Sequence, residues 1–166
     1  RLAEQIGRRN MAVLSAEEVA IIAPYTRWVD EHVSVFLGVE RLLVSRQHQF
    51  AGTADAIVVL NSDRYPAIVD VKTSKTALGM PEWRAQLAAY CIAAEEDRGL
   101  ICRRRIIVRL SRLEPDVLHV HELPEEELDS DKEVFLSLLR VYQWMQKSEP
   151  VTKSIGRIQF SGRNGR

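Results

Sequence analysis

Two apolar segments separated by a short polar loop constrain the fold of this chain more than any other feature. Residues 49–60 and 65–72 are rich in Val and Ile, and the loop between them reads Asn-Ser-Asp-Arg. β-Branched residues on both sides of such a loop predict a β-hairpin. If Leu60 faces Tyr65 across the four-residue loop, the numbers of paired residues sum to 125.

This register places Asp55 directly opposite Asp70. Paired side chains in an antiparallel ladder have Cβ atoms about 4.5–5.5 Å apart, and like charges there are destabilising. Lys72 shares a face with Asp70, because alternate residues of a strand point the same way. Carboxylates in an apolar hairpin are costly unless they are compensated. A divalent cation that prefers oxygen ligands, such as Mg²⁺ or Mn²⁺, would compensate both.

The remaining elements complete a mixed sheet. Ser15 and Glu18 have capping-box spacing, so a helix is expected to begin at Ala16, and its apolar pattern extends to Gly38. Pro24 either kinks this helix or opens a second one. Further strands are expected at 39–45, 102–110 and 117–123, and helices at 82–97 and 129–147. The predicted fold class is α/β (α+β), with about five strands flanked by helices. We expect a single domain over residues 1–148 and an extended tail over 149–166.

Composition and charge exclude several classes of protein. The net charge is zero, which argues against a general nucleic-acid coat protein. Residues 98–112 carry six arginines and no acid, and residues 114–133 carry nine acids and one lysine. Each run is either a solvated face or, for the basic run, a local surface for phosphate. No apolar run is long enough for a membrane helix. The two cysteines indicate a reducing, intracellular compartment.

Three short motifs together resemble one known nuclease family. They are Gly52-Thr-Ala-Asp55, Asp70-Val-Lys72, and Gln86 followed four residues later by Tyr90. In this order, on strand, strand and helix, they resemble the RecB-type nucleases of the PD-(D/E)xK superfamily. The amino-acid sequence around these motifs is similar to that of phage and prophage members and of the mitochondrial genome maintenance exonuclease. The resemblance implies a restriction-endonuclease-like core.

The resemblance also implies a role for each matching residue. Asp55 and Asp70 are expected to ligate Mg²⁺ or Mn²⁺, with the Val71 backbone carbonyl as a further ligand. Lys72 is expected to position the attacking water and help to deprotonate it. The residues expected to support the site and the DNA beside it are Gln86, Tyr90, Thr73, Ser74 and Lys75.

One family element is not matched. Related nucleases carry a metal-binding His on an early helix, and residues 1–9 resemble the sequence that follows this His. The N-terminal part of the domain is therefore expected upstream of Arg1. Glu40 either contacts a metal-bound water or is a solvated strand residue. His48 is interpreted as a loop residue, and His119 and His121 as structural.

The sequence thus favours a Mg²⁺- or Mn²⁺-dependent deoxyribonuclease. The expected activity is that of an exonuclease on single strands or DNA ends, in recombination, repair or phage DNA processing. We expect it in the cytoplasm of a bacterial or phage-infected cell. Its expected partners are DNA and recombination or replication proteins, without a membrane. One alternative is a nuclease-fold domain that binds DNA or a protein without cutting. Another is a CRISPR-associated adaptation-type nuclease, whose iron–sulfur cluster requires four cysteines. Because only Cys91 and Cys102 are available, no cluster is expected.

Overall fold

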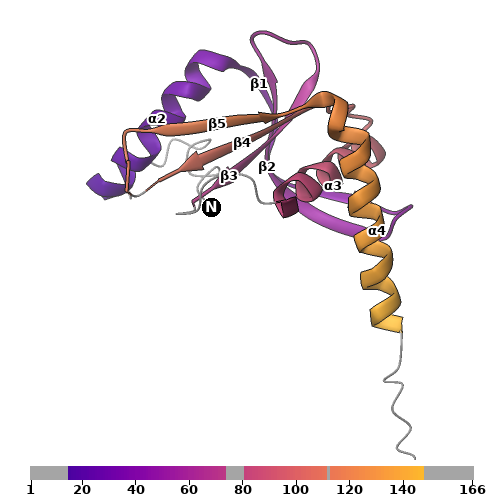
Figure 1. Ribbon diagram of the computed structural model, residues 1–166. Coiled ribbons are helices and arrows are strands. Elements are labelled where there is room, and N and C mark those ends of the chain that lie inside the picture. The colour runs from indigo at the N-terminus through magenta and orange to yellow at the C-terminus, as the bar shows by residue number, and fades with distance from the viewer. Residues whose placement is uncertain (1–14, 74–80, 112, 148–166) are drawn as a thin grey trace, which may run out of the picture.

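A single five-stranded sheet organises the chain. The computed structural model describes residues 15–73, 81–111 and 113–147 (Figure 1). The strands lie in the order β1-β2-β3-β4-β5, and only the pair β3–β4 is parallel. Their bounds are Val33–Ser45 (β1), Phe50–Leu60 (β2), Pro66–Lys72 (β3), Arg104–Leu110 (β4) and Leu118–Leu123 (β5). The predicted mixed sheet and α+β class are confirmed.

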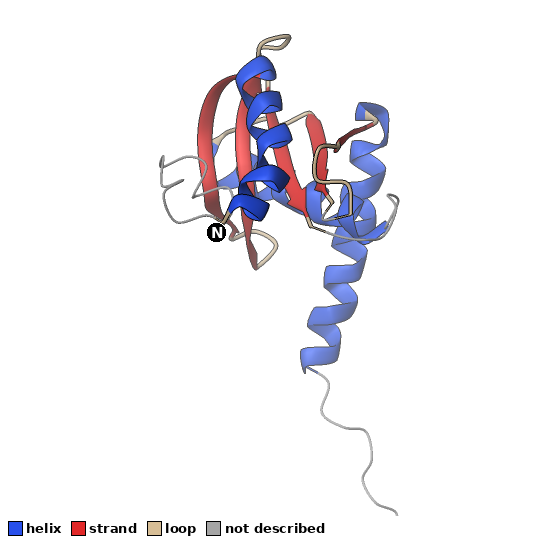
Figure 2. Ribbon diagram, turned by 90° about the vertical axis from the view of Figure 1, so that its left-hand side faces the viewer, coloured by secondary structure: helices blue, strands red, loops and turns tan. Residues whose placement is uncertain are grey.

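Helices cover both faces of this sheet (Figure 2). Helix α2 (Ala16–His32) packs on one face through Tyr25 and Val29, and α3 (Pro81–Arg98) covers the other face. Because α3 connects β3 to β4, it forms the crossover that a parallel pair requires. A short 3₁₀ helix, η2 (Glu125–Glu127), leads into α4 (Leu128–Lys147). Among the described residues, no helix is long and apolar enough to cross a membrane.

The first helix begins as predicted but ends earlier. The Glu18 backbone N–H donates to Ser15 Oγ at 3.2 Å, and the Ser15 N–H donates to the Glu18 carboxylate at 2.8 Å, which completes the capping box. Pro24 lies inside one continuous helix. The helix stops at His32, whereas the apolar pattern predicted Gly38, so β1 starts at Val33 and not at residue 39. Val33 and Val35 pair with β2, and this tertiary pairing overrides the helical periodicity.

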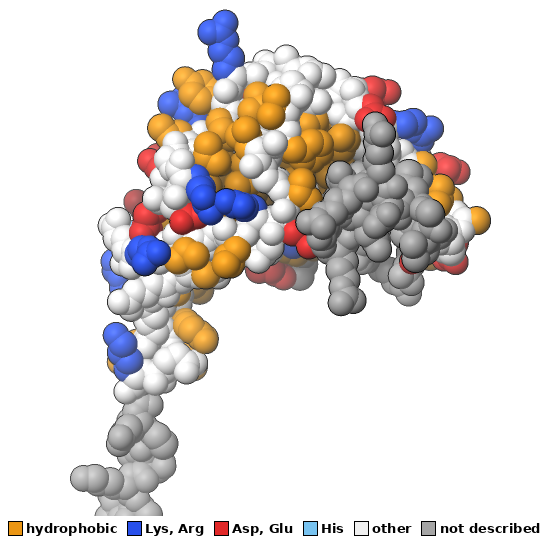
Figure 3. Space-filling view, turned by 180° about the vertical axis from the view of Figure 1, so that it is seen from behind, with side chains coloured by type: hydrophobic (Ala, Val, Ile, Leu, Met, Phe, Trp, Pro, Cys, Tyr) orange, Lys and Arg blue, Asp and Glu red, His pale blue; other side chains and the backbone are white. Residues whose placement is uncertain are grey.

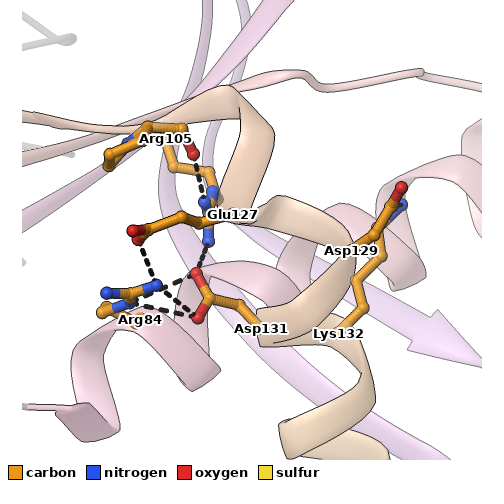
Figure 4. A network of polar contacts seen from close by, with 7 residues as sticks. Arg84, Arg105, Glu127, Asp129, Asp131 and Lys132 are labelled. Carbon is orange, nitrogen blue, oxygen red and sulfur yellow. Dashed lines mark hydrogen bonds and ion pairs between the residues drawn. The ribbon is translucent and has the colours of Figure 1, made fainter.

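The basic run of β4 is paired with the acidic run that follows it. Arg104 donates to Glu122 on the neighbouring strand at 2.5 and 2.6 Å, and Arg103 lies 3.5 Å from Glu125. Arg105 is fully buried and pairs with Asp131 at the start of α4 (Figure 4). Arg105 is therefore buried as the partner of Asp131 and joins β4 to α4, and Arg104 joins β4 to β5. Arg103 keeps half of its side chain exposed.

Some sequence predictions lie outside the described residues. They are the helix-like segment at residues 1–9, the two supporting residues Ser74 and Lys75, and the extended tail predicted for residues 149–166.

Candidate active site

The hairpin ladder ends at the two predicted aspartates. The last paired residues are Ala56 and Val69, in the register whose numbers sum to 125, so Asp55 and Asp70 are the next facing positions. Beyond this point the Asp55 carboxylate, rather than a backbone carbonyl, accepts the Val71 N–H at 2.7 Å. A side-chain bond thus replaces a ladder bond. It leaves both carboxylates where β2 and β3 part.

The regular alternation of β2 breaks at Asp55. Ala54 packs with the core under α3, whereas Ala56, two residues on, packs with the core under α2. The facing position on β1 is Glu40, between the pairs Val39–Ala56 and Arg41–Ala54. Glu40 has a φ of 44°, in the left-handed region that is uncommon for a non-glycine residue. The irregularity of both strands therefore centres on the Asp55 position.

Asp70 and Lys72 form an ion pair on the α3 side of β3. Lys72 Nζ lies 2.7 Å from Asp70 Oδ2, and Asp70 is 2% exposed. Burial raises the pKa of the Asp70 carboxyl; the Lys72 ammonium lowers it, and the negative charge of Asp55 raises it further. Within the described residues, Asp70 Oδ2 accepts no well-aligned hydrogen bond. This buried oxygen therefore has coordination capacity left for a cation.

A chain of polar contacts extends from Lys72 along α3. Lys72 Nζ donates to Gln86 Oε1 at 2.9 Å, and Gln86 Nε2 donates to the Tyr90 hydroxyl at 2.8 Å. Gln86 and Tyr90 meet because residues four apart share one face of a helix. The Trp83 ring lies 5.9 Å from Lys72 Nζ, at the outer limit of a cation–π contact. Sequence reasoning missed Trp83, although its position three residues before Gln86 places it on the same helix face.

A second residue that sequence reasoning missed approaches the site from the opposite face of the sheet. Tyr25 of α2 is 2% exposed, and burial together with the charge of Asp55 raises its pKa to about 12. The tyrosine is thus a neutral neighbour of the Asp55 carboxylate. In the sequence Tyr25 falls within the apolar pattern expected for the first helix, which does not indicate a place beside Asp55.

Gly52 allows the Tyr90 ring to pack against β2. A Cβ atom added at Gly52 would lie 2.8 Å from Tyr90 Cε1, closer than real contacts allow. The Tyr90 ring is held between this backbone and its bond to Gln86. The glycine of the Gly-Thr-Ala-Asp motif therefore makes room for the tyrosine of the helix motif.

Replacing Gly52 with alanine is expected to destabilise the protein by roughly 1–3 kcal/mol, because the buried ring must shift. The same shift breaks the Gln86–Tyr90 bond, so cleavage is expected to fall as well. Urea denaturation measures the first effect and a cleavage assay the second. Thr53→Ala, at an exposed position on the same strand, is the control and should change stability by less than about 0.5 kcal/mol. If Gly52→Ala matched this control, the packing role of Gly52 would be wrong.

Of the other predicted residues, Glu40 adjoins the site and the rest lie elsewhere. Glu40 is half-buried opposite Asp55, and Thr73 is exposed at the end of β3. His48 lies in the turn after β1, as predicted, and His119 and His121 lie on β5, two strands away from β3. Cys91 and Cys102 are buried in the core under α3. Across residues 15–73, 81–111 and 113–147, no three His, Cys, Asp or Glu side chains form a metal-binding group.

The oxygen ligands at the point where β2 and β3 part nevertheless fit a hard divalent cation. They include the carboxylates of Asp55 and Asp70; Asp70 Oδ2 is ion-paired with Lys72 at 2.7 Å and accepts no well-aligned hydrogen bond. Carboxylate and carbonyl oxygens suit Mg²⁺ or Mn²⁺, and an ion with one or two protein carboxylates keeps several waters. An incomplete protein shell is therefore consistent with binding of such an ion.

Comparison with known proteins agrees with this geometry. A model of the PD-(D/E)XK nuclease superfamily matches residues 2–152. No curated protein matches the chain in sequence.

Proposed function

Because the chain belongs to the PD-(D/E)XK nuclease superfamily, we propose that it is a Mg²⁺- or Mn²⁺-dependent deoxyribonuclease that hydrolyses phosphodiester bonds. Members of this superfamily are generally nucleases that use divalent metal ions and act on DNA. The observation that carries the proposal is that Asp55, Asp70 and Lys72 lie together where β2 and β3 part. The amino-acid sequences of the three motifs support a RecB-type exonuclease that acts on single strands or DNA ends.

The proposed mechanism assigns the metal to Asp55, Asp70 and the Val71 carbonyl. When bound, the ion supplies charge neutralisation at the phosphate and lowers the pKa of a bound water. Asp55 is oriented by the Val71 N–H, and Asp70 by its burial beside Lys72. Lys72 Nζ, held by Asp70 Oδ2 and Gln86 Oε1, orients the attacking water and stabilises the negative charge that develops on its oxygen as the water proton passes to solvent. Glu40, beside Asp55, is proposed to contact a water of the ion.

The test is digestion of purified protein with 5′- and 3′-labelled DNA in single-stranded, double-stranded and circular forms. Cleavage that requires a divalent ion supports the proposal, and release of products from one end identifies an exonuclease. Absence of cleavage with Mg²⁺, Mn²⁺ and other divalent ions would refute the proposed nuclease activity.

The two facing carboxylates also predict how metal affects stability. Mg²⁺ or Mn²⁺ is expected to raise the melting temperature, because the ion binds the folded protein and not the unfolded chain. Asp55→Asn keeps an oxygen that can accept the Val71 N–H but removes one negative charge. It is therefore expected to stabilise the metal-free protein slightly and to abolish the metal-induced gain. Thermal melting with EDTA and with each metal measures both effects. An Asp55→Asn protein that melts like wild type in EDTA and still gains stability with metal would contradict the pairing.

A further inference from the structure

A groove of about 480 Å³ lies beside the proposed catalytic residues, between β2, α3 and α4. Its lining is mostly apolar and includes Phe50, Gly52, Gln86, Tyr90, Phe135 and Tyr142. Gln86 and Tyr90 belong both to this groove and to the chain of contacts that begins at Lys72. The groove is therefore continuous with the candidate active site.

Aromatic rings form a large part of the groove. The rings of Phe50 and Phe135 meet edge to face with centroids 4.9 Å apart, and Tyr142 is 60% exposed. On α4, Phe135, Leu138 and Tyr142 are spaced as one helical stripe, and Leu138 is also exposed. Helix α4 is tied to the turn after β1 by a bond of 2.9 Å from Gln143 Nε2 to the His48 carbonyl. The exposed Tyr142 ring thus stands on an anchored helix.

The basic residues of α4 lie outside the groove lining, on another side of the helix. From Phe135 to Lys147, α4 carries Arg140 and Lys147 and no acid. Figure 3 shows this part of α4 extending from the body with hydrophobic and basic side chains on the visible face. A smaller polar hollow of about 180 Å³, lined by His48, Arg140 and Gln143, adjoins the groove through Leu139. Glu82, at the α3 end, is the acid in the groove lining.

We propose that this groove is a stacking site for the unpaired bases of single-stranded nucleic acid, next to the catalytic centre. This inference rests on the proposed function, because the strand must continue from the Asp70–Lys72 site past Gln86 and Tyr90. Aromatic side chains bind the faces of unpaired bases without regard to sequence, whereas the faces of bases in a duplex are covered by their neighbours. Continuity with the site and the absence of acids on this half of α4 favour nucleic acid over an apolar peptide.

The experiment is fluorescence anisotropy with a 5′-labelled oligothymidylate, single-stranded or annealed to oligodeoxyadenylate, in EDTA. Wild type is expected to bind the single strand more tightly than the duplex. Tyr142→Ala is expected to weaken single-strand binding about tenfold, and Tyr142→Phe to retain it, because the phenyl ring keeps the stacking face. Trp144→Ala is the matched control, since Trp144 is an exposed aromatic residue of the same helix outside the groove lining. It is expected to bind like wild type.

Three results would overturn the stacking site. They are equal affinity for single strand and duplex, unchanged binding by Tyr142→Ala, and loss of binding by Tyr142→Phe equal to that of Tyr142→Ala. A parallel cleavage assay separates this inference from the proposed function. Metal-dependent cleavage without any effect of Tyr142→Ala on strand preference refutes the groove alone. Tyr142-dependent binding without cleavage by any divalent ion supports the groove and refutes the nuclease.

Discussion

The Lys72→Ala protein is expected to cleave DNA about 10²–10⁴-fold more slowly than wild type while it still binds the divalent ion. Lys72 Nζ contacts Asp70 and Gln86, so its loss removes the ammonium beside the attacking water and leaves both carboxylates in place. Asp70→Ala is expected to remove cleavage as well, but through loss of a metal ligand. Initial rates with labelled DNA measure the first effect, and the metal-induced rise in melting temperature separates the two variants.

Lys132→Ala is the matched control, because Lys132 lies on α4 and pairs only weakly, at 3.9 and 4.0 Å, with two acids. It should cleave at the wild-type rate. Near-normal turnover by Lys72→Ala would contradict the role of the lysine. Loss of the metal-induced rise in melting temperature in Lys72→Ala would show that the lysine orders the metal ligands instead.

The Asp131→Ala protein is expected to be about 3–5 kcal/mol less stable than wild type. Asp131 accepts from Arg84 at 2.8 and 3.0 Å and pairs with Arg105, which is fully buried (Figure 4). Arg105 also donates to the Pro124 carbonyl at 2.8 Å, but that contact does not neutralise its charge. Removal of Asp131 leaves a buried guanidinium without a counter-ion. Urea denaturation monitored by circular dichroism measures the change.

Two further variants separate this buried pair from surface electrostatics. Glu127 also pairs with Arg84, but its side chain is 42% exposed, so Glu127→Ala should cost less than about 1 kcal/mol. The double variant Arg105→Met with Asp131→Leu removes both buried charges and should recover much of the lost stability. A double variant less stable than Asp131→Ala would show that the two residues do not act mainly as a charge pair.

The sequence by itself determined the local features of this protein. Hairpin pairing depends on loop length and strand pattern, so the four-residue loop predicted the register that the ladder keeps up to Ala56–Val69, one position before Asp55 and Asp70. The capping box located the start of α2, because its two bonds join residues three apart. The spacing of Gln86 and Tyr90 predicted a shared helix face, and the hydrogen bond between them is present. Each of these features depends on residues close together in the chain.

Only the tertiary structure decided which distant residues meet. Helix α2 ends at His32 because β2 offers a pairing edge to Val33, which the helical periodicity of that segment does not reveal. Arg105 is buried because Asp131 reaches it from 26 residues away. The proximity of Tyr90 to Gly52 and of Phe135 to Phe50 likewise follows from how α3 and α4 pack on the sheet. Residue spacing specifies hydrogen bonds within an element or a hairpin. Burial and charge pairing between elements depend on the free energy of the whole packed core.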